Sequence, residues 1–78
     1  MRSACKPERL QALLEERNMS MQTLARLTEI PVTTIRAYLH GRRDAISTRN
    51  MFLIARTLDM PMSELVDYLS EAVNIDKK

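Results

Sequence analysis

The sequence predicts an all-α fold, a compact domain of five short helices joined by short connections. Apolar residues recur at spacings of three and four, and no useful stretch alternates apolar with polar residues. The chain also has one glycine and an aromatic content of 4%, which disfavours a sheet. Its 78 residues suffice for one domain. We therefore expect a single domain over residues 1–78, with a core from about 7 to 72 and frayed ends at 1–5 and 74–78.

The first two helices are expected over residues 7–17 and 21–28. Pro7 suits the first position of a helix, and the apolar stripe behind it consists of Leu10, Leu13 and Leu14. Ser20 offers a side-chain oxygen to the free amides of the second helix, so we expect it to be the N-cap. Leu24 and Ala25 would face the core.

A short turn over residues 29–31 leads to a third helix over 32–40. Ile35 would face inward, together with either Tyr38 or Leu39. Gly41 follows where a helix often ends on a left-handed residue.

The fourth and fifth helices follow a loop over residues 42–46. Ser47 is the expected N-cap of a helix that carries Met51, Phe52, Ile54, Ala55 and Leu58. Asp59 and Met60 interrupt the pattern, and Pro61 opens the last helix. Its apolar stripe is Met62, Leu65, Val66, Leu69 and Val73.

Charge is distributed unevenly along the chain. Residues 1–58 hold ten lysines and arginines against five acids, a net charge of +5, whereas residues 59–78 hold two lysines against five acids, a net charge of −3. Most of the positive charge is arginine, which forms forked hydrogen bonds with phosphate and guanine. The asymmetry fits either a nucleic-acid surface or an ordinary solvated surface.

Enzymatic chemistry is not favoured by the residues present. Cys5 and His40 are the single cysteine and histidine, they lie on different segments, and no phosphate loop or nucleophile motif is present. We therefore expect no catalytic residue, metal or cofactor. No apolar run approaches the ~20 residues of a membrane span, and no signal peptide is recognisable. A soluble, cytoplasmic protein without a membrane partner is expected.

The helices at 21–28 and 32–40 form the most informative feature, which spans residues 20–40. Two helices joined by a turn of about three residues are typical of the helix-turn-helix that binds DNA. Small Ala25 allows the helices to approach closely, and Ile30 and Ile35 fill the angle between them. The first-turn positions of helix 32–40 that do not face the core would enter the major groove.

In these features, residues 13–69 resemble the lambda-repressor-like helix-turn-helix domains of the Cro/repressor or Xre class. The residues that carry the resemblance are Ser20, Leu24, Ala25, Ile30, Ile35, Gly41, Ile54, Ala55, Leu58, Glu64 and Leu65. The resemblance implies a five-helix DNA-binding domain that regulates transcription, with double-stranded DNA as its partner.

The resemblance also implies a site centred on residues 32–40. The positions that read bases are Val32, Thr33, Arg36 and Ala37. The positions that contact phosphate are Met21, Gln22, Thr34, His40, Arg42, Arg43 and Arg49. Arg36 is the expected guanine contact because its guanidinium matches that base in two places, although a phosphate contact remains open.

Three positions depart from the family pattern. Glu29 replaces the usual turn glycine, Thr28 replaces an apolar residue, and Leu27 replaces a polar one. Either helix 21–28 is slightly rotated or Leu27 contacts another surface.

A dimer is expected because one recognition helix covers only one half-site. Its interface would be the stripe of Met62, Leu65, Val66, Leu69 and Val73, which otherwise packs within the monomer. The leading interpretation is a homodimeric repressor of the phage, plasmid or mobile-element type that binds a palindromic operator. The alternative is an antitoxin, or another protein-interaction module on the same fold, with a protein partner and with DNA binding secondary.

Overall fold

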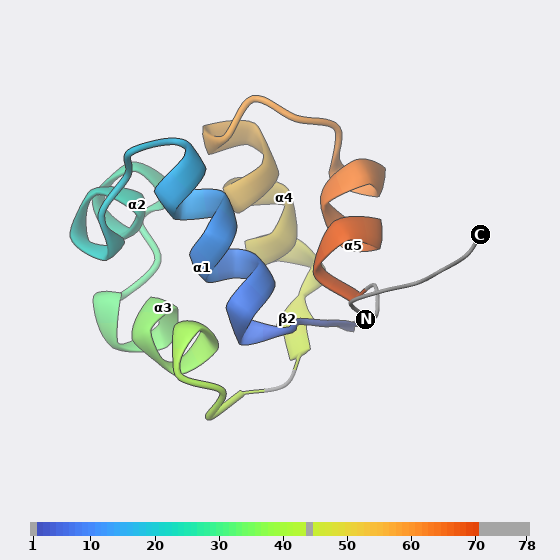
Figure 1. The fold of residues 1–78 in the computed structure, drawn as a ribbon, viewed down its shortest axis with the longest axis horizontal. Coiled ribbons are helices and arrows are strands. Elements are labelled where there is room, and N and C mark those ends of the chain that lie inside the picture. The colour runs from blue at the N-terminus through green and yellow to red at the C-terminus, as the bar shows by residue number, and fades with distance from the viewer. Residues whose placement is uncertain (1, 44, 71–78) are drawn as a thin grey trace.

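The computed structural model describes residues 2–43 and 45–70. Its elements are β1 (Arg2–Ala4), α1 (Pro7–Glu16), α2 (Met21–Thr28), α3 (Val32–Leu39), β2 (Ala45–Ser47), α4 (Thr48–Thr57) and α5 (Met62–Ser70). The five helices confirm the predicted all-α fold. In Figure 1, α1 and α4 lie centrally, with α2 and α3 on one side and α5 on the other.

The helix starts follow from the capping residues in the sequence. Pro7 occupies the first turn of α1. The Ser20 hydroxyl oxygen accepts a hydrogen bond of 3.1 Å from the Thr23 amide, and the Ser47 hydroxyl accepts one of 3.2 Å from the Asn50 amide. Both serines are therefore the N-caps that the sequence predicts.

A small antiparallel sheet is an addition that the sequence prediction lacks. Ser3 of β1 lies opposite Ile46 of β2. Ile46 is fully buried, and the Lys6 amide donates a 2.9 Å hydrogen bond to the Leu69 carbonyl of α5. Because these long-range contacts hold the segment, the expectation that residues 1–5 fray is wrong for Arg2–Ala4 and Cys5. The predicted fraying at 74–78 lies outside the described residues.

Cys5 joins this segment to the core. Its side chain is buried, and burial, with a smaller contribution from the Glu8 carboxylate, raises the pKa of the Cys5 thiol to about 11. The thiol is therefore neutral near pH 7 and packs as a small apolar side chain.

The core draws on all five helices and on β2. Its largest fully buried side chains are Leu10, Leu24, Ile35, Tyr38, Ile46, Met51, Ile54, Leu58, Leu65 and Leu69. Of the two alternatives for α3, Tyr38 enters the core and Leu39 is half-buried. No helix within residues 2–43 and 45–70 is long and apolar enough to cross a bilayer.

Candidate nucleic-acid interface

The connection between α2 and α3 consists of Glu29, Ile30 and Pro31, as the sequence predicts. Ile30 is buried between the two helices, together with Ala25 of α2 and Ile35 of α3. Pro31 has the extended backbone of a residue that precedes a helix, with φ −54° and ψ 139°. Packing of Ile30 and Ile35 therefore holds α3 at a defined angle to α2.

The turn forms without glycine because Glu29 itself adopts the left-handed conformation, with φ 63° and ψ 20°. Its side chain is exposed, so only the backbone is strained, by about 1 kcal/mol. Thr28 explains the second departure from the pattern. Its buried hydroxyl donates to the Leu24 carbonyl at 2.7 Å and accepts from the Ile30 amide at 3.3 Å. A polar residue is thus satisfied at a buried position.

One face of α3 points away from the core. Thr33, Arg36, Ala37 and His40 follow one another at spacings of three, one and three, so they share a helix face. Thr33 and His40 are exposed, and Arg36 and Ala37 are half-buried. The structure thus brings three of the predicted base-reading residues together. The remaining predicted residues of this helix, Val32 and Thr34, are half-buried at its start.

The cap at the end of α3 determines where the next two arginines lie. Gly41 has φ 74°, and the Arg42 amide donates to the Ala37 carbonyl at 2.9 Å. The Gly41 amide donates to the Tyr38 carbonyl at 3.4 Å. This is a Schellman cap, which confirms the predicted role of Gly41. Arg42 and Arg43 leave it exposed, directly beyond the exposed face of α3.

The starts of α2 and α4 hold the other predicted phosphate contacts. Met21 is half-buried and Gln22 is exposed on the first turn of α2, while Arg49 is exposed on the first turn of α4. Asn50 lies beside Arg49, and its side-chain amide donates to the Tyr38 hydroxyl at 3.0 Å. This bond joins α4 to α3. The sequence pattern does not indicate this hydrogen bond, because both residue types are ordinary within a helix.

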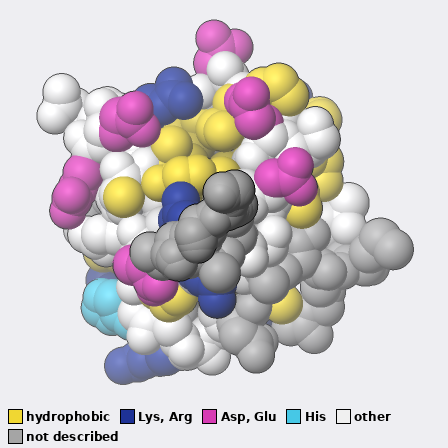
Figure 2. Space-filling model, turned by 45° about the vertical axis from the view of Figure 1, so that its right-hand side comes forward, with side chains coloured by type: hydrophobic (Ala, Val, Ile, Leu, Met, Phe, Trp, Pro, Cys, Tyr) yellow, Lys and Arg dark blue, Asp and Glu magenta, His cyan; other side chains and the backbone are white. Residues whose placement is uncertain are grey.

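The face of α5 corrects part of the predicted interface. Leu65 and Leu69 are fully buried within the chain, so they leave no surface for a partner. Met62 and Val66 are half-buried, and Val73 lies outside the described residues. Figure 2 shows hydrophobic side chains surrounded by acidic ones on the side of the molecule that carries α5.

An exposed helix, held by a second helix across a three-residue turn and followed by two arginines, defines a helix-turn-helix DNA-binding domain. A family model described as helix-turn-helix matches residues 10–65. The chain belongs to this family, in its lambda-repressor-like (Xre) class, and is a DNA-binding transcription regulator.

Two solved structures are similar. The restriction-modification controller protein C.AhdI from Aeromonas hydrophila is 29% identical, with a TM-score of 0.68 over 76% of this chain and 88% of that one. A transcriptional regulator from Listeria innocua is 23% identical, with a TM-score of 0.65 over 88% of this chain and 64% of that one, and shows the fold alone. No curated protein matches the chain significantly.

Proposed function

We propose that the protein is a repressor that binds a palindromic operator as a homodimer and occludes a promoter. The observation that carries this proposal is the exposed face of α3, formed by Thr33, Arg36, Ala37 and His40, with Arg42 and Arg43 directly beyond it. None of the four residues of that face belongs to the hydrophobic core. A helix of this kind fits the major groove, where base edges can be distinguished.

The base-reading roles follow from the chemistry of each side chain. Arg36 donates two hydrogen bonds to one guanine. Thr33 makes one hydrogen bond and meets a thymine methyl group, and Val32 and Ala37 offer apolar contact only. The operator half-site therefore contains a guanine beneath the middle of α3.

Phosphate contacts surround this helix and fix its position on the duplex. The amides at the start of α2, at Met21 and Gln22, favour an anion. Thr34 on α3 and His40 just beyond it donate to phosphate, and the cations are Arg42, Arg43 and Arg49. Gln22, His40 and the three arginines are exposed in the structure, which supports these roles.

Met62 and Val66 on α5 are the proposed dimer contacts, with Val73 beyond the described residues. Acidic Glu64 and Asp67 lie on the same helix and disfavour DNA at this end of the molecule. A two-fold dimer places two copies of α3 about one helical turn of DNA apart.

The similar structure is described as a restriction-modification controller protein, which supports a regulatory role. We further propose that the protein serves a phage, a plasmid or another mobile element and acts in the cytoplasm.

Salt dependence of binding to random duplex DNA tests the basic surface. The affinity should fall steeply with salt, and Arg42→Ala with Arg43→Ala should reduce the slope of log K against log [salt] by about 2. Glu15→Ala with Glu16→Ala, two exposed acids on α1, is the matched control and should not flatten the slope. Weak binding that does not depend on salt would contradict the proposal.

A second candidate, a protein-interaction module such as an antitoxin, is favoured by one observation. Leu27 is 50% exposed on α2, at a position that the fold does not require to be apolar. That residue borders the groove described next.

A further inference from the structure

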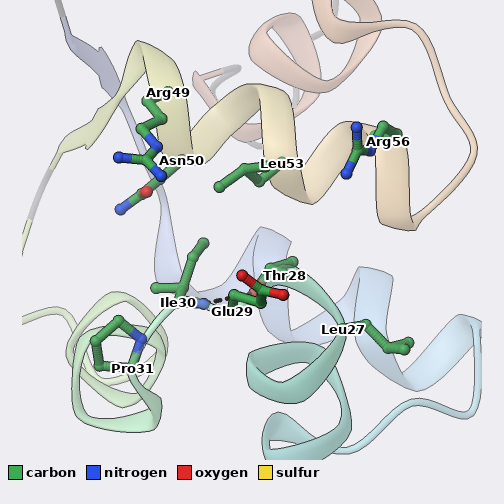
Figure 3. A pocket seen from close by; sticks show the side chains of 9 residues that line it. All are labelled: Leu27, Thr28, Glu29, Ile30, Pro31, Arg49, Asn50, Leu53 and Arg56. Atoms are coloured by element: carbon green, nitrogen blue, oxygen red, sulfur yellow. Dashed lines mark hydrogen bonds between the residues drawn. The ribbon is translucent and has the colours of Figure 1, made fainter.

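A groove of about 300 Å³ lies between the end of α2 and the outer side of α4. In Figure 3, Arg49, Leu53 and Arg56 project from α4 on one wall, and residues 27–31 form the other wall. This volume is at the lower end of the range for ligand clefts, so it accommodates one or two side chains of a partner.

The groove has an apolar border that the core does not use. Leu27 and Phe52 are the large hydrophobic side chains that remain exposed within residues 5–43 and 45–70, each at 50%. Leu27 lines the groove, as does half-buried Leu53. Phe52 is adjacent on α4, where its ring lies 5.8 Å from the Arg56 guanidinium. Exposed apolar residues gathered beside a cleft are typical of an interaction site.

Positive charge stands at both ends of this groove. Arg49 and Arg56 are exposed and seven residues apart on α4, which corresponds to about 10 Å along the helix axis. Glu29 is the acidic residue of the lining. The groove is therefore complementary to two separated carboxylates with an apolar group between them.

We propose that this groove binds an extended segment of a partner protein in which a large apolar side chain lies between two carboxylates about 10 Å apart. The apolar side chain contacts Leu27 and Leu53, and the carboxylates pair with Arg49 and Arg56. Side chains on one face of an extended chain are two residues apart, so the apolar residue lies midway between acidic residues four positions apart. These span about 13 Å at the backbone, and their flexible side chains reach the two arginines. This protein-binding site is additional to the proposed operator binding.

A protein segment fits the groove better than DNA does. Phosphates and sugars would leave Leu27 and Leu53 without apolar contact, whereas a protein segment supplies an apolar side chain. Pro31 at one end of the groove directly precedes α3, so the bound segment lies beside the DNA surface. Arg49 serves both surfaces and is therefore not used in the test.

Titration of the protein with a short peptide, followed by backbone amide NMR, tests the proposal. The probe is a capped Ser-Glu-Ala-Leu-Ala-Glu-Ser peptide, which in extended form places the leucine and both glutamates on one face. One control peptide has lysine in place of both glutamates, and a second has serine in place of leucine. Only the first peptide should give saturable shift changes centred on Leu27, Leu53 and Arg56. Absence of saturable binding, or equal binding of the lysine peptide, would overturn the proposal.

Variants locate the site. Arg56→Glu and Leu27→Ser should each weaken peptide binding about fivefold, and circular dichroism should show both folded because both side chains are exposed. Arg26→Glu reverses a neighbouring exposed arginine outside the lining and should change the affinity less than twofold. Equal losses of peptide affinity in Arg26→Glu and Arg56→Glu would show that binding depends only on net charge, and would refute the proposed site.

The same variants separate this proposal from operator binding. Leu27→Ser should leave the affinity for random duplex DNA and its salt slope unchanged, whereas the Arg42 and Arg43 variants should alter both. A loss of DNA binding in Leu27→Ser would assign the groove to DNA. A loss of self-association in Leu27→Ser would assign it to a second copy of this chain. Either result would overturn the proposed binding of a partner segment. Operator binding is tested separately, by the Arg42 and Arg43 variants.

Discussion

Glu29 carries the strain of the turn between α2 and α3. Its φ of 63° is energetically unfavourable for a residue with a Cβ atom. The next residue, Ile30, is buried. The packing of Ile30 thus holds the backbone in place, and Glu29 itself makes no buried contact because its side chain is exposed.

Glu29→Gly should therefore raise the free energy of unfolding by about 0.5–1 kcal/mol, since glycine removes the strain at this backbone position. Glu15→Gly is the matched control. Glu15 is an exposed residue inside α1, so its replacement should lower stability by about 1 kcal/mol. Urea denaturation of both variants measures the difference. Destabilisation by both substitutions would show that Glu29 is not strained.

Local chemistry explains which of these residue-scale features the sequence could predict. Ser20, Ser47 and Gly41 act on atoms within a few positions along the chain, and their roles were predicted correctly. Thr28 is accommodated at a buried position because its hydroxyl forms a hydrogen bond with the backbone of its own helical turn. The apolar pattern of a family does not reveal this hydrogen bond.

At the scale of elements, the orientation of α3 depends on contacts at both of its ends. Ile30 and Ile35 anchor its start against α2. The Asn50 amide, from the first turn of α4, bonds the Tyr38 hydroxyl near its end at 3.0 Å. This hydrogen bond joins two helices that both bear predicted DNA contacts. It therefore helps to fix the position of α3, which carries Arg36, relative to α4, which carries Arg49.

A double-mutant cycle tests this link. Tyr38→Phe and Asn50→Ala should each lower the free energy of unfolding, and the coupling between them should be about 0.5–1.5 kcal/mol. Thr57→Ala, on the same helix and half-buried, serves as the control and should show no coupling to Tyr38→Phe. A coupling energy near zero would mean that the hydrogen bond adds no stability.

Elements formed by distant residues were the ones that sequence reasoning missed. β1 and β2 are three residues each, too short for a strand pattern, and they pair across more than forty positions. Likewise, the groove between α2 and α4 arises only when the two helices pack. The apolar stripe on α5 can be predicted from the sequence. Which of its residues are buried, as Leu65 is, and which are half-buried, as Val66 is, depends on how α5 packs against α4.

At the scale of the whole molecule, the two ends differ in charge and in their proposed roles. Arginines surround α3, whereas Glu64 and Asp67 lie on α5. Such a distribution orients the protein on a polyanion with α3 toward the DNA and α5 away from it. It also leaves Met62 and Val66 free to pair with a second copy.

Val66→Glu should therefore prevent the proposed dimer from forming, because a carboxylate would be buried at the proposed interface. Ser63→Glu adds the same charge at an exposed position of α5 and should leave the dimer intact. Sedimentation velocity gives the mass of each variant, and thermal melts check that both are folded. A wild type that remains monomeric at tens of micromolar would contradict the α5 interface.

Specific recognition by α3 is the central claim, and Arg36 tests it most directly. Duplexes selected from random DNA by the wild-type protein provide the cognate operator, and binding of wild type and Arg36→Ala is then measured on this operator and on random DNA. The substitution should cost roughly 1–3 kcal/mol on the operator and little on random DNA. Equal losses on both duplexes would make Arg36 a phosphate contact and contradict base reading by α3.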